Sequence, residues 1–182
     1  MIYLLAICCA VTMVTVTCET RVAIAHLVAG DVKGSVWFTE TDVGVRVTGK
    51  IEGLDAGLHG FHIHELGDTS SCDAAGSHFN PDDTFHGGPD HDQRHVGDLG
   101  NIRFNEDKVA DIDFVDHVIS LRGRNNVLGR TLILHAEEDD LGLGGAADSL
   151  TTGNAGSRLA CAVIGLSAPV DPWLKLLHPN EE

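Results

Sequence analysis

Seven side chains of metal-binding type stand out in this 182-residue sequence. Six are histidines, whose neutral imidazole binds copper, zinc, iron and nickel, and one is a carboxylate. They form a close pair, then a group spread along a polar segment, then one further histidine. Their number and proximity predict a two-metal site better than a scatter of surface histidines does. The seven are His62, His64, His78, His86, His95, Asp98 and His135.

The close pair suggests two ligands of one ion. His62 and His64 are separated by one residue in the strand-like run 60–64. Successive side chains of a strand point to opposite faces, so both imidazoles should lie on the same face. An H-x-H pair is a weak signal by itself, but His135 ends another strand-like run and strengthens it.

The spread group suits a different ion. The imidazoles of His78, His86 and His95 with the carboxylate of Asp98 fit a tetrahedral zinc site without an open position. The alternative is a solvated histidine-rich loop, because His91 and several aspartates lie nearby. Spacing alone leaves both interpretations open.

Short runs rich in Val, Ile and Thr, together with 21 glycines, favour strands joined by turns. Two long segments, 65–97 and 136–157, have neither strand nor helix pattern, and such loops inside a compact domain are usually functional. Most of the candidate ligands lie in or beside the first loop, and His135 directly precedes the second loop. The predicted strands are 22–28, 36–38, 43–48, 60–64, 101–104, 110–115, 131–135 and 159–164.

The ends of the chain differ from its middle. Residues 2–16 are nearly all apolar, which predicts a signal peptide over 1–18, a secreted product and no membrane attachment in the mature form. An uncleaved anchor is the alternative, because about 17 apolar residues are the lower limit for a span. A lipid-anchored Cys18 is a third. The domain would cover 19–166, and 167–182 would be a tail that is either frayed or docked.

The net charge restricts the possible partners, and the cysteines suggest a disulfide. A net charge of −15 argues against nucleic acid as a partner, and it would repel an anionic substrate unless the site has its own positive field. Removal of the signal leaves Cys72 and Cys161. In a secreted chain two cysteines most simply pair, the alternative being two free buried thiols.

Six motifs closely resemble those of copper/zinc superoxide dismutases. They are G-L-H-G-F-H-I-H at 57–64, H-F-N-P at 78–81, H-G-G-P at 86–89, H-V-G-D-L-G at 95–100, L-G-R-T-L at 128–132 and the segment 153–165. The resemblance covers roughly 22–166 in matching order. It implies an all-β, eight-stranded antiparallel Greek-key barrel or sandwich with two long functional loops, and a homodimer with contacts near 128–130 and 163–166.

The resemblance also implies roles for single residues. Alternating Cu(II)/Cu(I) redox would dismute superoxide to O₂ and hydrogen peroxide, with His78 bridging the metals and taking up a proton. Arg158 would line the copper channel, Asp139 would link His62 to His86, and Cys72–Cys161 would be the intrasubunit disulfide. Copper would be bound by His62, His64, His78 and His135, and zinc by His78, His86, His95 and Asp98.

One departure concerns substrate guidance. The family's second loop usually carries a Glu-Glu…Lys trio, and the matching positions here are Ala147, Asp148 and Thr151. The steering lysine is absent, so we expect activity with a flatter salt dependence. Two divalent ions less the charges of Asp98 and bridging His78 would still leave about +2 at the site.

Three rival interpretations predict other properties. A copper-binding or delivery domain of the same fold should lose copper ligands or the channel arginine, and a copper-only enzyme should lack the zinc ligands and the second loop. A secreted adhesion-type sandwich leaves the seven ligands unexplained. We expect His59 to be a packing residue. The histidines expected not to be ligands are His26, His91, His117 and His178.

Overall fold

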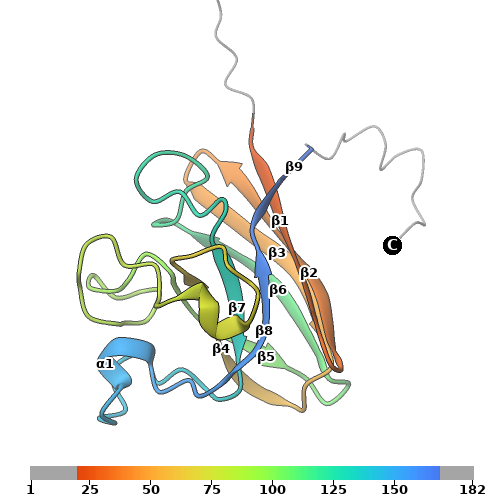
Figure 1. Ribbon diagram of the computed structural model, residues 1–182, viewed down its shortest axis with the longest axis vertical. Helices are drawn as coiled ribbons and strands as arrows, with labels where there is room; N and C mark the ends of the chain where they lie inside the picture. Colours follow the sequence, from red (N-terminus) through yellow and green to blue (C-terminus); the bar gives the residue numbers. More distant parts are fainter. Residues whose placement is uncertain (1–19, 169–182) are drawn as a thin grey trace, which may run out of the picture.

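A computed structural model describes residues 20–168, which form two antiparallel sheets (Figure 1). The five-stranded sheet has the order β6-β3-β2-β1-β9, and the four-stranded sheet has the order β5-β4-β7-β8. A 3-10 turn η1 (Cys72–Ala75) and a short helix α1 (Ser149–Thr152) lie in the two long loops. The strands are β1 (Val22–Ala29), β2 (Val32–Thr41), β3 (Gly44–Glu52), β4 (Gly57–His64), β5 (Asp98–Phe104), β6 (Val109–Asp116), β7 (Thr131–His135), β8 (Arg158–Val163) and β9 (Gly165–Ser167).

The connections make this a Greek-key barrel, as predicted. The chain leaves the first sheet after β3, forms β4 and β5 in the second sheet, and returns as β6 to pair with β3. At the opposite edge β8 and β9 are one strand interrupted at Ile164, with β8 paired to β7 and β9 paired to β1. The Ile164 N–H donates to the Arg130 carbonyl (2.8 Å), and its own carbonyl accepts from the Gly129 N–H (2.9 Å).

Alternation along the strands fills the space between the sheets. In β2, Val36 and Phe38 are fully buried, whereas Trp37 between them lies on the outer face and is half-buried. In β1 the fully buried positions are Ala23, Ala25 and Leu27. Burying each large apolar side chain contributes about 1.5–3 kcal/mol, so the core supplies a rigid frame for the loops.

All eight predicted strands are present, most of them longer than predicted, and β9 is additional. The described chain continues in β-structure to Ser167, one residue past the predicted domain end. Within residues 20–168 no helix is long and apolar enough to cross a membrane. The predicted signal peptide, His178 and nearly all of the predicted tail lie outside the described residues.

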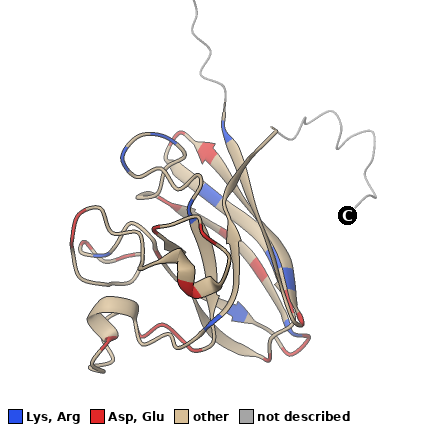
Figure 2. Ribbon diagram, in the orientation of Figure 1, with Lys and Arg blue, Asp and Glu red and all other residues tan. Residues whose placement is uncertain are grey.

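Charged residues are distributed unevenly along the chain (Figure 2). On the outer face of the five-stranded sheet, cross-strand pairs neutralise the bases, as in Arg46–Asp113 (2.7 Å) and Lys50–Asp111 (3.6 Å). The loop 65–97 carries mainly Asp and Glu, apart from Arg94. The acidic excess is therefore concentrated in loops, not in the sheet.

Candidate metal centre

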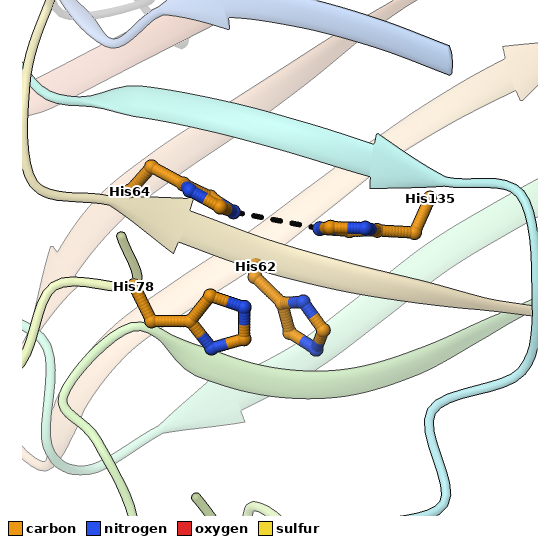
Figure 3. A group of neighbouring side chains, drawn as sticks. All are labelled: His62, His64, His78 and His135. Atoms are coloured by element: carbon orange, nitrogen blue, oxygen red, sulfur yellow. Dashed lines mark hydrogen bonds between the residues drawn. The ribbon is translucent and has the colours of Figure 1, made fainter. Parts of the chain in front are cut away.

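The first predicted ligand group converges from two adjacent strands and one loop. His62 and His64 lie on the same face of β4, and His135 ends the neighbouring strand β7. His78 is brought alongside by an isolated bridge to His64 at the end of β4. Figure 3 shows the four rings turned toward a common point, with the Nε2 atoms of His64 and His135 3.4 Å apart.

The donor atoms of this group fit a bound metal ion. Two nitrogens about 2.0 Å from one tetrahedral ion would lie about 3.3 Å apart, close to the observed spacing of His64 and His135. His62 Nδ1 and His78 Nε2 are buried and have no hydrogen-bond partner. A buried, unpaired polar atom costs about 1–3 kcal/mol, and coordination would satisfy both. Four imidazoles are a donor set that copper binds well.

The second predicted group forms around Asp98 at the start of β5. Asp98 Oδ1 lies 2.7 Å from His78 Nδ1 and 3.1 Å from His95 Nδ1. His86 Nδ1 lies 3.0 Å from Asp98 Oδ2 but makes no hydrogen bond with it. All four residues are buried, and three nitrogens with one carboxylate oxygen suit tetrahedral zinc.

His78 is the residue that the two groups share. Its Nδ1 faces Asp98, and its unpaired Nε2 is left for the group containing His62 and His64. The loop is held in this position by backbone pairing to β4. Phe79 N–H donates to the Ile63 carbonyl (2.8 Å), and Ile63 N–H donates to the Gly97 carbonyl (2.8 Å).

Asp139 connects the two groups from the opposite side. Its carboxylate accepts from His62 Nε2 through Oδ2 and from His86 Nε2 through Oδ1, both at 2.8 Å. These hydrogen bonds place the ring protons on Nε2 and leave each Nδ1 lone pair for a metal. Asp139 thus contacts one histidine of each group, His62 and His86.

The other imidazoles are oriented by backbone carbonyls. In each ring the nitrogen that faces away from the ligand group lies beside a carbonyl oxygen, to which its N–H can donate. This leaves the second nitrogen as a donor to a metal. The pairs are His64 Nδ1 with Gly76 O (2.9 Å), His95 Nε2 with Thr84 O (3.1 Å) and His135 Nδ1 with Gly156 O (3.3 Å).

Burial keeps three histidines of the first group, His64, His78 and His135, neutral. Loss of solvation, together with the charges of neighbouring His78 and Arg158, lowers the pKa of His64 to about 2. Burial, then proximity to His62, likewise lowers the pKa of His78 and of His135 to about 3. Neutral imidazole is the form that binds metal ions, so these three histidines are ready for them at neutral pH.

The carboxylates behave differently. Burial alone would raise the pKa of Asp98 and of Asp139, but hydrogen bonds from the surrounding histidines hold both well below their usual range. For His86, burial alone would lower the pKa, but the hydrogen bond to Asp139 and the proximity of Asp98 raise it to about 9. Two buried carboxylates therefore favour positive charge at His86, which a proton or a metal ion can supply.

Cys72 and Cys161 form a disulfide, as predicted, which ties η1 to β8. Arg158 reinforces this link, because its Nη1 donates to the Cys72 carbonyl (2.8 Å) and its Nη2 to the Gly76 carbonyl (2.7 Å). Gly76 O also lies against His64, so the guanidinium stands beside the first ligand group. Its side chain is 21% exposed and can meet an approaching anion.

Several other residues lie outside the two ligand groups. His59 is a packing residue, with Nδ1 3.0 Å from the His135 carbonyl and its ring edge-on to Phe104. Within residues 20–168 His26, His91 and His117 belong to no potential metal-binding group. Thr151 lies exposed in α1.

Sequence reasoning missed two polar contacts that support the site. Asn101 in β5 binds the backbone of Asp139 through two hydrogen bonds of 2.8 Å. Arg94 is buried, pairs with Asp116 (2.8 Å) and donates to the carbonyl of the adjacent His95 (3.1 Å). Neither contact has a local signal in the sequence. Arg94 and Asp116 are 22 positions apart, and Asn101 and Asp139 are 38 positions apart.

Comparison with known proteins agrees with this geometry. Residues 32–164 match the family described as copper/zinc superoxide dismutase. The chain is 51% identical over 153 residues to an extracellular Cu-Zn superoxide dismutase of Drosophila melanogaster, covering 79% of this chain and 84% of that protein. It is 56% identical over 139 residues to Cu-Zn superoxide dismutase A of Xenopus laevis, covering 75% and 91% respectively. The crystal structure of the clock protein EA4 superposes with a TM-score of 0.79 at 46% identity, covering 84% of this chain and 99% of that one.

Proposed function

The chain belongs to the copper/zinc superoxide dismutase family, and from that premise we propose a role for each residue of its site. The activity is dismutation of superoxide to O₂ and hydrogen peroxide, with copper and zinc as cofactors. We assign copper to His62, His64, His78 and His135. We assign zinc to His78, His86, His95 and Asp98.

The observation that carries this assignment is the division of His78 between two buried groups. Its Nδ1 lies against Asp98, whereas its Nε2 has no protein partner. A bridging imidazole needs both nitrogens aimed at different ions, and no hydrogen bond within the described residues competes for Nε2. A site for a single ion would account for only one of the two buried groups.

When bound, copper supplies one-electron chemistry by cycling between Cu(II) and Cu(I), and zinc, which has no redox chemistry, fixes structure and charge. The chain's own contribution is positional and protonic. His78 would hold and release a proton at Nε2, while its Nδ1 stays with Asp98 in the group assigned to zinc. Asp139 keeps the rings of His62 and His86 in one orientation during that exchange.

Arg158 is assigned the binding of superoxide. Its planar guanidinium suits a small anion and is held by the Cys72 and Gly76 carbonyls beside the copper group. The lysine expected at the channel mouth is replaced by exposed Thr151. We therefore expect guidance of superoxide to depend on the local field of the ions and Arg158.

We propose that the protein is a homodimer. Leu166 is 67% exposed and Val163 is 39% exposed, and this edge is tied to the predicted contact segment at Gly129 by the Ile164–Gly129 hydrogen bond. Exposed apolar side chains grouped in this way favour an interface. Leu166→Asp should halve the mass measured by light scattering. Leu143→Asp, at another highly exposed leucine, should leave it unchanged.

We also propose secretion after removal of residues 1–18, leaving a dismutase domain over 19–166 and a tail over 167–182, with no nucleic-acid or membrane partner. The Cys72–Cys161 disulfide and the similarity to an extracellular relative support an oxidising destination. Expression in a eukaryotic secretory host and mass spectrometry of the medium test this proposal. An N-terminus beginning before residue 10 would contradict it.

Metal content and superoxide turnover, measured on one purified sample, test the function. We expect copper and zinc in equal amounts and superoxide decay far faster than with free copper in pulse radiolysis. A rate no better than free copper would contradict the enzyme and favour a copper-delivery domain. His64→Ala is the matched variant, because it should lose copper and activity while keeping the zinc group.

A further inference from the structure

Asn101 makes an unusual pair of contacts for a strand residue. It lies in β5, three positions after Asp98, where it pairs with Gly60 of β4. Its Nδ2 donates to the Asp139 carbonyl at 2.8 Å, and its Oδ1 accepts from the Asp139 N–H at 2.8 Å. One carboxamide therefore satisfies both backbone groups of a residue 38 positions away.

The residue held in this way is the one that joins the two metal groups. Asp139 is 1% exposed, and its two carboxylate oxygens bind His62 and His86 at 2.8 Å. It lies in the loop 136–157, outside the sheets, so no strand pairing fixes its backbone. Asn101 supplies that fixed point from the rigid β4–β5 pair.

The carboxylate tolerates little displacement. Useful hydrogen bonds need donor–acceptor distances of about 2.7–3.2 Å, so a shift of about 0.5 Å at Asp139 would weaken at least one of the two histidine contacts. A side chain that fixes the backbone of Asp139 therefore also fixes the ring orientation of His62 and His86. Such indirect partners typically change metal affinity about 10- to 100-fold.

We propose that Asn101 is a positioning residue for the copper and zinc sites, acting through the backbone of Asp139. The inference rests on the proposed function, because it assumes that His62 and His86 bind the two metals. It goes beyond that function by extending the site to a side chain that touches neither ligand. A merely structural role would affect folding stability and leave the metals unchanged.

The first test measures zinc affinity by competition with a chromophoric chelator, and copper geometry by visible and electron paramagnetic resonance spectra. Asn101→Ala should weaken zinc binding about 10- to 100-fold and shift the copper spectrum. Asn101→Asp should also weaken it, because a carboxylate oxygen would face the Asp139 carbonyl. A nearby negative charge without positioning would strengthen zinc binding, so tighter binding in this variant would overturn the proposal.

Asn105→Ala is the matched control. Asn105 also uses its side chain to bind backbone groups, accepting from the N–H groups of Asp107 and Val109 at 3.0 Å, but in the turn after β5. The Asn105→Ala variant should lose about as much unfolding free energy as Asn101→Ala. Its zinc affinity and copper spectrum should stay as in the wild type. Equal metal losses in Asn101→Ala and Asn105→Ala would contradict the positioning role.

A double-mutant cycle tests the route through Asp139. In an Asp139→Ala background there is no carboxylate to orient, so adding Asn101→Ala should leave zinc affinity unchanged within about twofold. Independent, multiplying losses would overturn the proposed route. If the wild type itself binds no zinc or copper, the proposed function fails. If the wild type binds both and Asn101→Ala binds equally well, only this inference fails.

Discussion

Removing the Cys72–Cys161 disulfide should destabilise the protein by an amount set mainly by loop length. The bridge closes a loop with a sequence separation of 89 residues. In the chain-entropy treatment such a loop loses about 15 cal/mol/K in the unfolded state, equivalent to about 4.6 kcal/mol near room temperature. We therefore expect Cys72→Ser/Cys161→Ser to lose about 4–5 kcal/mol of unfolding free energy.

Urea unfolding with a chelator present in all samples is the suitable assay, because metal binding would add its own stabilisation of the native state. With a urea slope of about 2 kcal/mol/M, the midpoint should fall by about 2 M. The reduced wild type should unfold at the same urea concentration as the double variant. A loss below about 1.5 kcal/mol for both would refute the reasoning from unfolded-state entropy. A loss of unfolding free energy in the double variant but not in the reduced wild type would indicate that the serine substitutions themselves destabilise the native state.

Other predictions follow from single positions. Gly153→Ala would press its methyl group against Asp139 Oδ1 at a backbone φ of 67°, so zinc affinity in chelator competition should fall at least tenfold; unchanged affinity would contradict the close packing. Thr151→Lys should steepen the fall of kcat/KM with ionic strength, and equal slopes would count against the steering argument. Burial alone would raise the pKa of Glu40, but the hydrogen bond and charge of Arg122 outweigh it and lower that pKa. The stability that Glu40 contributes is therefore present above the ordinary value of 4.5 and lost as pH falls through the folded pKa, so Glu40→Gln should flatten the acid limb of stability measured by urea unfolding.

The strands were predictable because their pattern is local. The buried Val36 and Phe38 of β2 follow the two-residue period of a strand with one buried face, and in β4 the same period separates Phe61 and Ile63 from the ligands His62 and His64. The break at Ile164 had no such signal, because it depends on carbonyl and N–H groups of the Gly129–Arg130 turn in the neighbouring chain segment. Helix α1 was missed because its four residues are too few to show helical periodicity.

The residues of the site were likewise predictable only where the sequence itself carries a signal. The metal-binding types of His62, His64 and Asp98 are visible in the sequence, and the family motifs assign each to a group. Asn101 carries no such information, because an asparagine in a strand usually binds water or its own turn. Its role emerges only when the second loop lies against β5, and this requires the barrel to be closed.

The conflict between an acidic chain and an anionic substrate also depends on distance. A net charge of −15 describes the whole molecule, but at physiological salt exposed charges are screened over about 8 Å. Bases on the five-stranded sheet are paired with acids across strands, so the sheet contributes little net field at the site. Arg158 stands beside the ligands, is mostly shielded from solvent and is fixed by two carbonyls. Superoxide close to the site should therefore respond to Arg158 and the bound ions, whereas the acidic loops affect its approach mainly at low salt.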